Sequence, residues 1–183
     1  MQTVHEKGFA NAGLREISAA AGVAQGSFTN HFASKEAFGL AILERYFASL
    51  ETLMAETFAD QDRRPLDRLM GYFDAITQLF SDNGWRFGCL AGNMALDSSE
   101  HSELIRHKLD TIFATWARSF ADVIRAAQTA GEVDPAIDAG EASAALLDAW
   151  HGAMLRMKIE RSPAPLLRFK RHIFPALLKA PAP

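Results

Sequence analysis

The segment Leu14–Phe32, which reads LREISAAAGVAQGSFTNHF, limits the possible folds more than any other part of the chain. Its apolar residues recur at helical spacing up to Gly22, which predicts a short helix ended by a glycine turn. Val23 is expected to bury its side chain in the core beneath the turn. Small polar residues follow from Ala24 and predict a second short helix. Two such helices form a helix-turn-helix, whose second helix can enter the major groove of DNA.

A helix, a glycine turn and another helix also occur in all-helical proteins that bind no DNA, so the flanking residues matter. Residues 7–38 read KGFANAGLREISAAAGVAQGSFTNHFASKEAF. This string resembles the DNA-binding domain of the TetR/AcrR family of bacterial transcriptional regulators. The resemblance implies a recognition helix and a set of DNA-binding residues: Gln25, Gly26, Ser27, Thr29, Asn30, His31 and Lys35.

Different roles are expected within this set. The amide side chains of Gln25 and Asn30 can make bidentate contacts with adenine, and Lys35 can contact a phosphate. His31 is expected as a phosphate contact or as a cap at the end of the helix. Ser34 is a good N-cap for the helix that follows. Ala12 stands where the family often has a phosphate-contacting Thr, and Ala12 has no side-chain donor.

The N-terminal part of the motif is short, because only seven residues precede Gly8. The first helix that backs the motif in the family is therefore expected to be truncated. Without that helix, Ile17, Phe28 and Phe32 would be exposed. Residues 1–50 carry four basic and four acidic side chains, which sum to zero, so phosphate neutralisation can supply little of the DNA affinity.

Apolar residues recur at helical spacing along the rest of the chain, and polar, Gly or Pro clusters separate the periodic segments. They predict helices over residues 34–58, 65–81, 89–96, 100–130, 138–161 and 165–178. No alternation of period two is found, so no strands are expected. The predicted fold is all-α, with a helix-turn-helix DNA-binding domain at residues 1–46 and a helical ligand-binding and dimerisation domain at 47–183.

A second resemblance lies at Gly88–Asn93, which reads GCLAGN and looks like the start of the sixth helix in one group of TetR-like regulators. In that family the last two helices form a dimer and the middle helices enclose an effector pocket. Apolar residues expected at the dimer interface are Leu146, Leu147, Leu155, Leu166, Phe169 and Phe174.

The expected effector pocket lies between the helices that carry Phe80, Cys89, Trp116 and Trp150. Its candidate ligand-binding residues are mostly aromatic: Phe73, Phe80, Trp85, Cys89, Asn93, Phe113, Trp116, Phe120, Trp150, His151 and Met154. Large apolar residues with a few polar groups are typical of small-molecule pockets. For each aromatic residue taken singly, the alternative is an ordinary place in the core.

Cys89 has two interpretations. A thiol at a helix N-terminus can react as thiolate and sense electrophiles or oxidants, whereas a free cysteine usually behaves as a small buried apolar residue. The six histidines are scattered, and no second close pair joins Glu103 and His107, so neither a metal nor a cofactor is expected.

Composition fits a regulator that works in the cytoplasm. The single cysteine allows no intramolecular disulfide, no apolar run reaches the length of a membrane span, and no signal peptide precedes the motif. The sequence therefore predicts a ligand-responsive regulator, most often a repressor in this family, that binds palindromic double-stranded operator DNA as a homodimer. A small apolar or electrophilic effector would release the DNA.

Two alternatives stay open at this point. One is a helical small-molecule-binding protein with a non-functional DNA domain, which the short first helix and the zero net charge of residues 1–50 favour. The other is a helical-bundle enzyme. No paired carboxylates, nucleophile elbow or Gly-rich phosphate loop supports an enzyme.

Overall fold

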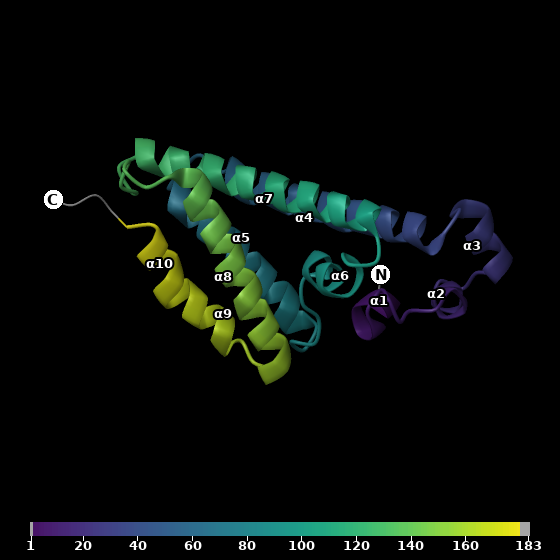
Figure 1. Cartoon of the computed structure of the whole chain (residues 1–183). Helices are drawn as coiled ribbons and strands as arrows, with labels where there is room; N and C mark the ends of the chain where they lie inside the picture. Colours follow the sequence, from purple (N-terminus) through teal and green to yellow (C-terminus); the bar gives the residue numbers. More distant parts are fainter. Residues whose placement is uncertain (1, 180–183) are drawn as a thin grey trace. The chain divides into compact units, whose positions relative to one another are not determined.

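The structure, a computed structural model, describes residues 2–179. Every regular element in that range is helical, as the sequence predicts (Figure 1). The elements are α1 (Gln2–Lys7), α2 (Leu14–Ala20), α3 (Gln25–His31), α4 (Lys35–Ala59), α5 (Pro65–Asp82), α6 (Leu90–Ser98), α7 (Glu103–Thr129), α8 (Ala139–Glu160), α9 (Ala164–Arg168), the π-helical turn η1 (Phe169–Ile173) and α10 (Phe174–Leu177). None of these helices combines the length and apolar composition that crossing a bilayer requires.

The chain divides into two compact units. The first comprises Met1–Ser49 and Cys89–Ile112, and the second comprises Leu50–Gly88 and Phe113–Pro183. The first compact unit therefore includes α6 together with the N-terminal helices. The boundary predicted from the sequence, after residue 46, instead assigns α6 to the second domain. The helix-turn-helix and the segment that begins at Cys89 belong to one structural unit.

The core of the first unit is built on small and aromatic residues. Ile17 and Phe28 are 8% and 5% exposed, so the expectation that a short first helix would expose them is wrong. Although α1 has six residues, it supplies Val4, which is also buried. The rings of Phe28, Phe32 and Phe38 lie with each pair of centroids 5.2 Å apart, and these contacts fix α3 against α4.

The turn between α2 and α3 needs a residue without a Cβ. Gly22 has φ +69°, in the left-handed region that glycine adopts without strain. The backbone N–H of Val23 donates to the Ser18 carbonyl at 3.0 Å and closes the turn. The Val23 side chain is 45% exposed, so the prediction that it plugs the core is wrong. Its backbone, rather than its side chain, holds the turn.

The second unit has an aromatic core. Phe73 of α5 lies 4.8 Å from Trp150 of α8 and 5.5 Å from Phe120 of α7, measured between ring centroids. Tyr72 packs edge-on against Trp116 at 6.4 Å. Such edge-to-face contacts are the preferred geometry of aromatic pairs.

The last segment is not one uninterrupted α-helix. The sequence predicts a helix over 165–178, and the structure contains α9, the π-helical turn η1 and α10 there. The N–H of Phe174 donates to the carbonyl of Phe169, five residues back. Pro175 follows, and proline has no N–H and clashes with the carbonyl four residues earlier, which favours a widened turn before it.

Candidate functional site

The outer face of α3 gathers most of the predicted DNA-binding residues. Phe28 is the one residue of α3 that is buried. The remaining side chains of this helix are exposed: Gln25, Gly26, Ser27, Thr29, Asn30 and His31. The Thr29 hydroxyl donates to the Gly26 carbonyl at 3.0 Å, which uses its proton within the helix and leaves its oxygen as an acceptor. The helix therefore presents amides and hydroxyls outward.

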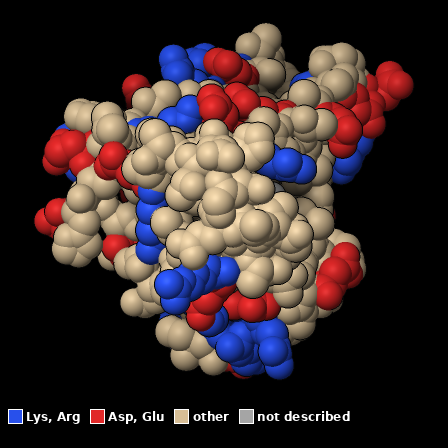
Figure 2. Space-filling view, turned by 90° about the vertical axis from the view of Figure 1, so that its right-hand side faces the viewer, with Lys and Arg blue, Asp and Glu red and all other residues tan. Residues whose placement is uncertain are grey.

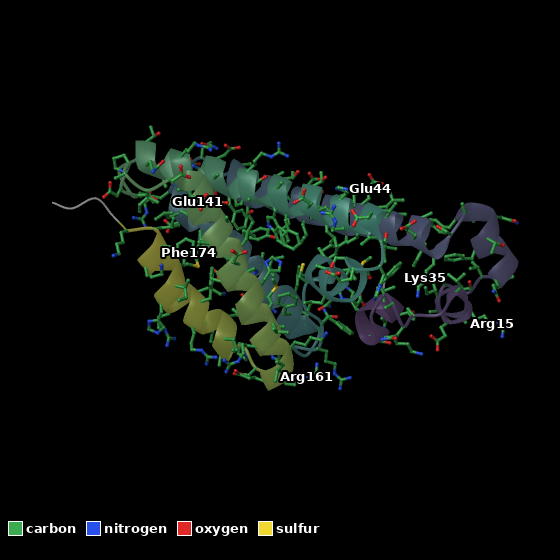
Figure 3. All side chains as sticks on the ribbon, in the orientation of Figure 1. Arg15, Lys35, Glu44, Glu141, Arg161 and Phe174 are labelled. Carbon is green, nitrogen blue, oxygen red and sulfur yellow. The ribbon has the colours of Figure 1, made fainter. Side chains whose placement is uncertain are left out.

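Arg15 joins this surface, and the sequence analysis did not select it. Its Nε donates to Oε1 of Gln25 at 3.3 Å, from the first turn of α2 (Figure 3). Both side chains are exposed. The contact orients the Gln25 amide, so that its NH₂ group remains available as a donor. No sequence spacing signals this pair, because the packing of α2 against α3 decides it.

Lys35 has a partner inside the first unit. Its ammonium donates to the carbonyl of Ala10 at 2.8 Å and lies 5.1 Å from the centre of the Phe9 ring. The side chain is half-buried at the start of α4, whose N-terminus is capped by the Ser34 hydroxyl, which accepts from Ala37 N at 3.0 Å. An ammonium has three donors, so a phosphate contact remains compatible with the bond to Ala10.

Charge is sparse around the helix-turn-helix. Figure 2 shows the face that carries α3, and its centre is largely free of charged side chains, with both signs at the edges. Lys7 lies 2.6 Å from Glu16 and lowers the pKa of that carboxyl, mainly through their hydrogen bond. Glu16 also accepts from the N–H of Gly13 at the start of α2. Because Lys7 already has an acidic partner, uncharged groups must contribute much of any DNA recognition on this surface.

The predicted ligand-binding residues are divided between the units. Cys89 and Asn93 belong to the first unit, and the other nine belong to the second. Several of those nine form the aromatic core, since Phe73, Trp116, Phe120 and Trp150 are at most 2% exposed. The three pockets described within the units are lined by none of the eleven. Their assignment to an effector site stays a prediction.

His151 is the most informative polar residue among them. Its Nδ1 lies 2.8 Å from the Leu147 carbonyl, and since a carbonyl only accepts, Nδ1 carries the proton. In the neutral ring Nε2 is then the acceptor. The imidazole packs edge-on against Trp116 at 5.3 Å and Phe113 at 5.1 Å. His151 is therefore held in one tautomer between two aromatic rings.

Cys89 is the N-cap of α6. Its Sγ accepts from the Gly92 N–H at 3.4 Å, and the Tyr46 hydroxyl lies at the same distance from the sulfur. The thiol is 4% exposed, which agrees with a buried small side chain. Asn93 lies one turn on, half-buried, and its N–H donates to the Cys89 carbonyl at 2.9 Å.

The prediction that a set of apolar residues forms a dimer interface is wrong for Leu146, Leu147, Leu166 and Phe174, which are buried in the core of the second unit. Phe169 is also buried, but it lines the groove described below. Leu155 is 52% exposed and stays a candidate. The large apolar side chains that are exposed on α8, α9 and η1 are instead Leu155, Ile159, Leu167 and Ile173, and we call the exposed surface of these segments the C-terminal face.

The C-terminal face also contains a groove. Its volume is about 320 Å³, and small residues of α8, Ala149, Gly152 and Ala153, line one side of it. Arg156 and Arg168 also line it. Small side chains allow another helix to approach closely, so this face has the shape and composition of a helix-packing surface.

Glu103 and His107 lie on the surface of α7. The carboxylate of Glu103 is 3.6 Å from the imidazole of His107 and 2.7 Å from the Arg106 guanidinium, and all three side chains are largely exposed. Arg106 is the main cause of the lowered pKa of Glu103. Within residues 2–179 no group of three or more potential ligands is placed to hold a metal ion.

Two family models match the chain, one at its N-terminal part and one at the part that follows. The model for bacterial regulatory proteins of the tetR family matches residues 1–42. The model for a tetracyclin repressor-like C-terminal domain matches residues 65–173. The first covers α1 to α3 and the start of α4, and the second runs from α5 into η1.

Individual relatives extend over nearly the whole chain. The HTH-type transcriptional repressor DhaR of Mycobacterium sp. (strain GP1) is 37% identical over 177 residues, which span 97% of this chain and 87% of DhaR. A crystal structure of a regulatory protein TetR from Rhodobacter sphaeroides superposes with a TM-score of 0.92 at 34% identity, covering 97% of this chain and 94% of that one. The crystal structure of the reduced form of Escherichia coli NemR superposes with a TM-score of 0.88 at 28% identity, covering 100% of this chain and 94% of that one.

Proposed function

Because this chain belongs to the TetR family of bacterial transcriptional regulators, we propose that it is a ligand-responsive repressor that binds a palindromic operator as a homodimer. The observation that carries the proposal is the outer face of α3, where Gln25, Ser27, Thr29 and Asn30 are all exposed while Phe28 anchors the helix. Amide and hydroxyl groups on one helix can form hydrogen bonds with the donors and acceptors that base edges present in the major groove. The protein would act on DNA in the cytoplasm.

A dimer is required for operator binding of this kind. α3 has seven residues and reads one half-site, and two half-sites about one helical turn apart need two such helices on a two-fold axis. The C-terminal face supports the dimer, since its exposed apolar side chains and groove of small residues lie on two adjacent helical segments. A stable interface there would bury at least roughly 1,000 Å² in total.

The effector is proposed to be a small apolar or electrophilic molecule. The aromatic residues of the second unit support an apolar ligand, and the hydrogen-bonded Cys89 thiol supports an electrophile. The similar NemR structure is that of a reduced form. In either case the effector must bind the released state more tightly than the DNA-bound state, since a ligand with equal affinity for both shifts nothing.

The experiment that tests this function is selection of bound duplexes from a random library by the full chain, followed by footprinting of the enriched sequence. A palindrome with half-sites about one turn apart supports the proposal. Enrichment of no sequence, together with binding of small apolar ligands, would favour a helical ligand-binding protein without a DNA function. A turnover assay that detected catalysis would point to an enzyme, although DhaR and the Rhodobacter sphaeroides protein are named as regulators.

A further inference from the structure

The second unit contains a pocket that is lined by none of the eleven predicted ligand-binding residues. It lies between α4, α5 and α7 and has a volume of about 410 Å³, which is within the range of small-molecule sites. Met54, Phe58 and Val123 form apolar walls. Ser119 and Arg68 are polar residues of the lining, and Arg68 is its basic side chain.

Arg68 is unusual because it is a buried charge. The residue is 8% exposed, and a guanidinium remains protonated at any physiological pH. Its Nη1 donates to the carbonyl of Phe58 at 2.9 Å, close to the end of α4. Its Nε is buried with no hydrogen-bond partner. A guanidinium has five N–H donors, and that bond to Phe58 uses one of them.

Among residues 2–179, no carboxylate forms an ion pair with Arg68 within 4.0 Å. Glu51 and Asp122 line the pocket, but both are exposed. Asp122 pairs with Arg125 at 2.7 Å and so already has a basic partner. The carbonyl end of α4 offers Arg68 only a partial negative charge.

We propose that this pocket binds a small monocarboxylate with an apolar body, and that Arg68 receives the carboxylate. A planar carboxylate matches the guanidinium fork, and the resulting bonds are charge-assisted. The walls formed by Met54, Phe58 and Val123 would take the apolar body. Glu51 and Asp122 at the pocket would disfavour ligands with several negative charges.

The site also reaches the core of the unit through one side chain. Phe58 lines the pocket, and its ring packs 6.1 Å from both Tyr72 and Phe120. A ligand against Phe58 would thus contact a residue of the aromatic core. The proposal nonetheless concerns ligand binding alone, and it holds or fails independently of operator binding.

Calorimetry on the full chain without DNA tests the proposal, with benzoate as the probe and benzamide as its uncharged counterpart. We expect benzoate to bind and to raise the melting temperature as its concentration rises, and benzamide to do neither. Arg68→Gln should weaken benzoate binding by roughly 10-fold to 100-fold, as expected for hydrogen bonds to a charged group. Arg64→Gln is the matched control, because Arg64 is exposed, pairs with Asp67 at 2.9 Å and lies outside the pocket lining.

A second variant keeps the test decisive if Arg68→Gln fails to fold. Ala55→Phe adds bulk at an exposed position of the pocket lining and leaves Arg68 in place. It should abolish benzoate binding while the melting temperature of the unliganded protein stays unchanged. The proposal is overturned if benzoate does not bind, if benzamide binds equally well, or if both variants keep wild-type affinity. Arg68 would then serve only to cap the end of α4.

Discussion

The ammonium of Lys35 donates a hydrogen bond to the carbonyl of Ala10 at 2.8 Å, and so ties the first turn of α4 to the segment between α1 and α2. The same ammonium lies over the Phe9 ring, whose side chain is buried. Lys35 therefore holds together the helices that back the recognition helix. A residue expected only to contact DNA also has a structural role.

Lys35→Ala should change two separate properties. Loss of the hydrogen bond to Ala10 should lower the free energy of unfolding by about 1 kcal/mol, measured by urea titration. If Lys35 also contacts a phosphate, operator affinity falls alike on all sequences and the slope of log K against log salt decreases by about one unit. An unchanged slope would leave Lys35 with its structural role alone.

Gln25 and Asn30 should determine base preference. Replacing either with Ala should cost about 1–3 kcal/mol at one base position of the operator and relax specificity there. Gln78→Ala is the matched control, since Gln78 is an exposed amide on α5 in the other unit. Equal weakening on specific and random duplexes would mean that these amides contact phosphates.

Arg15→Ala tests the contact that orients Gln25. The expected result is a smaller version of the Gln25→Ala effect at the same base position, because the 3.3 Å contact to Oε1 would be lost. A loss of affinity that is uniform across sequences would instead assign Arg15 to the phosphate backbone.

The C-terminal face should hold the dimer together. Leu155→Glu places a charge on an exposed apolar residue of α8 and should weaken dimerisation by more than about 2 kcal/mol, roughly 30-fold in Kd. Sedimentation equilibrium measures the change. Leu96→Glu is the control, because Leu96 is 79% exposed on α6 in the other unit. Dissociation by Leu96→Glu and not by Leu155→Glu would place the interface elsewhere.

Cys89→Ser separates the two versions of effector sensing. If Cys89 is the trigger, this substitution should abolish release of DNA by electrophiles and leave operator binding intact, because Ser can still accept from the Gly92 N–H. If an aromatic pocket is the trigger, Trp116→Phe should shift the affinity for an apolar effector and Cys89→Ser should change little. Release that is insensitive to both substitutions would contradict both versions.

How much the sequence predicts depends on whether a feature is local. Gly22 has the positive φ that its turn position predicts, and the Ser34 hydroxyl caps α4 as expected. Apart from the interrupted last segment, the predicted helices also begin and end within a few residues of those observed. Each of these features depends on a few neighbouring residues, so its signal is contained in a short stretch of sequence.

Features that depend on packing between distant segments are not predictable in this way. Helical periodicity marks Leu146 and Phe174 as apolar-face residues, but it does not distinguish the core of one chain from an interface between two. The contact of Arg15 with Gln25 and the burial of Arg68 likewise follow from how helices pack together. The sequence therefore predicts the fold and the recognition helix, but not which polar groups share a site.

Fluorescence anisotropy of the full chain on its selected palindrome and on a scrambled duplex, at one fixed salt concentration, tests whether the protein binds a specific sequence as a dimer. We expect two chains per palindrome and an affinity at least about 10³-fold higher than for the scrambled duplex. We also expect Gln25→Ala to reduce this ratio and Gln78→Ala to leave it unchanged. Equal affinity for both duplexes, or one chain bound per palindrome, would contradict a sequence-specific dimeric regulator.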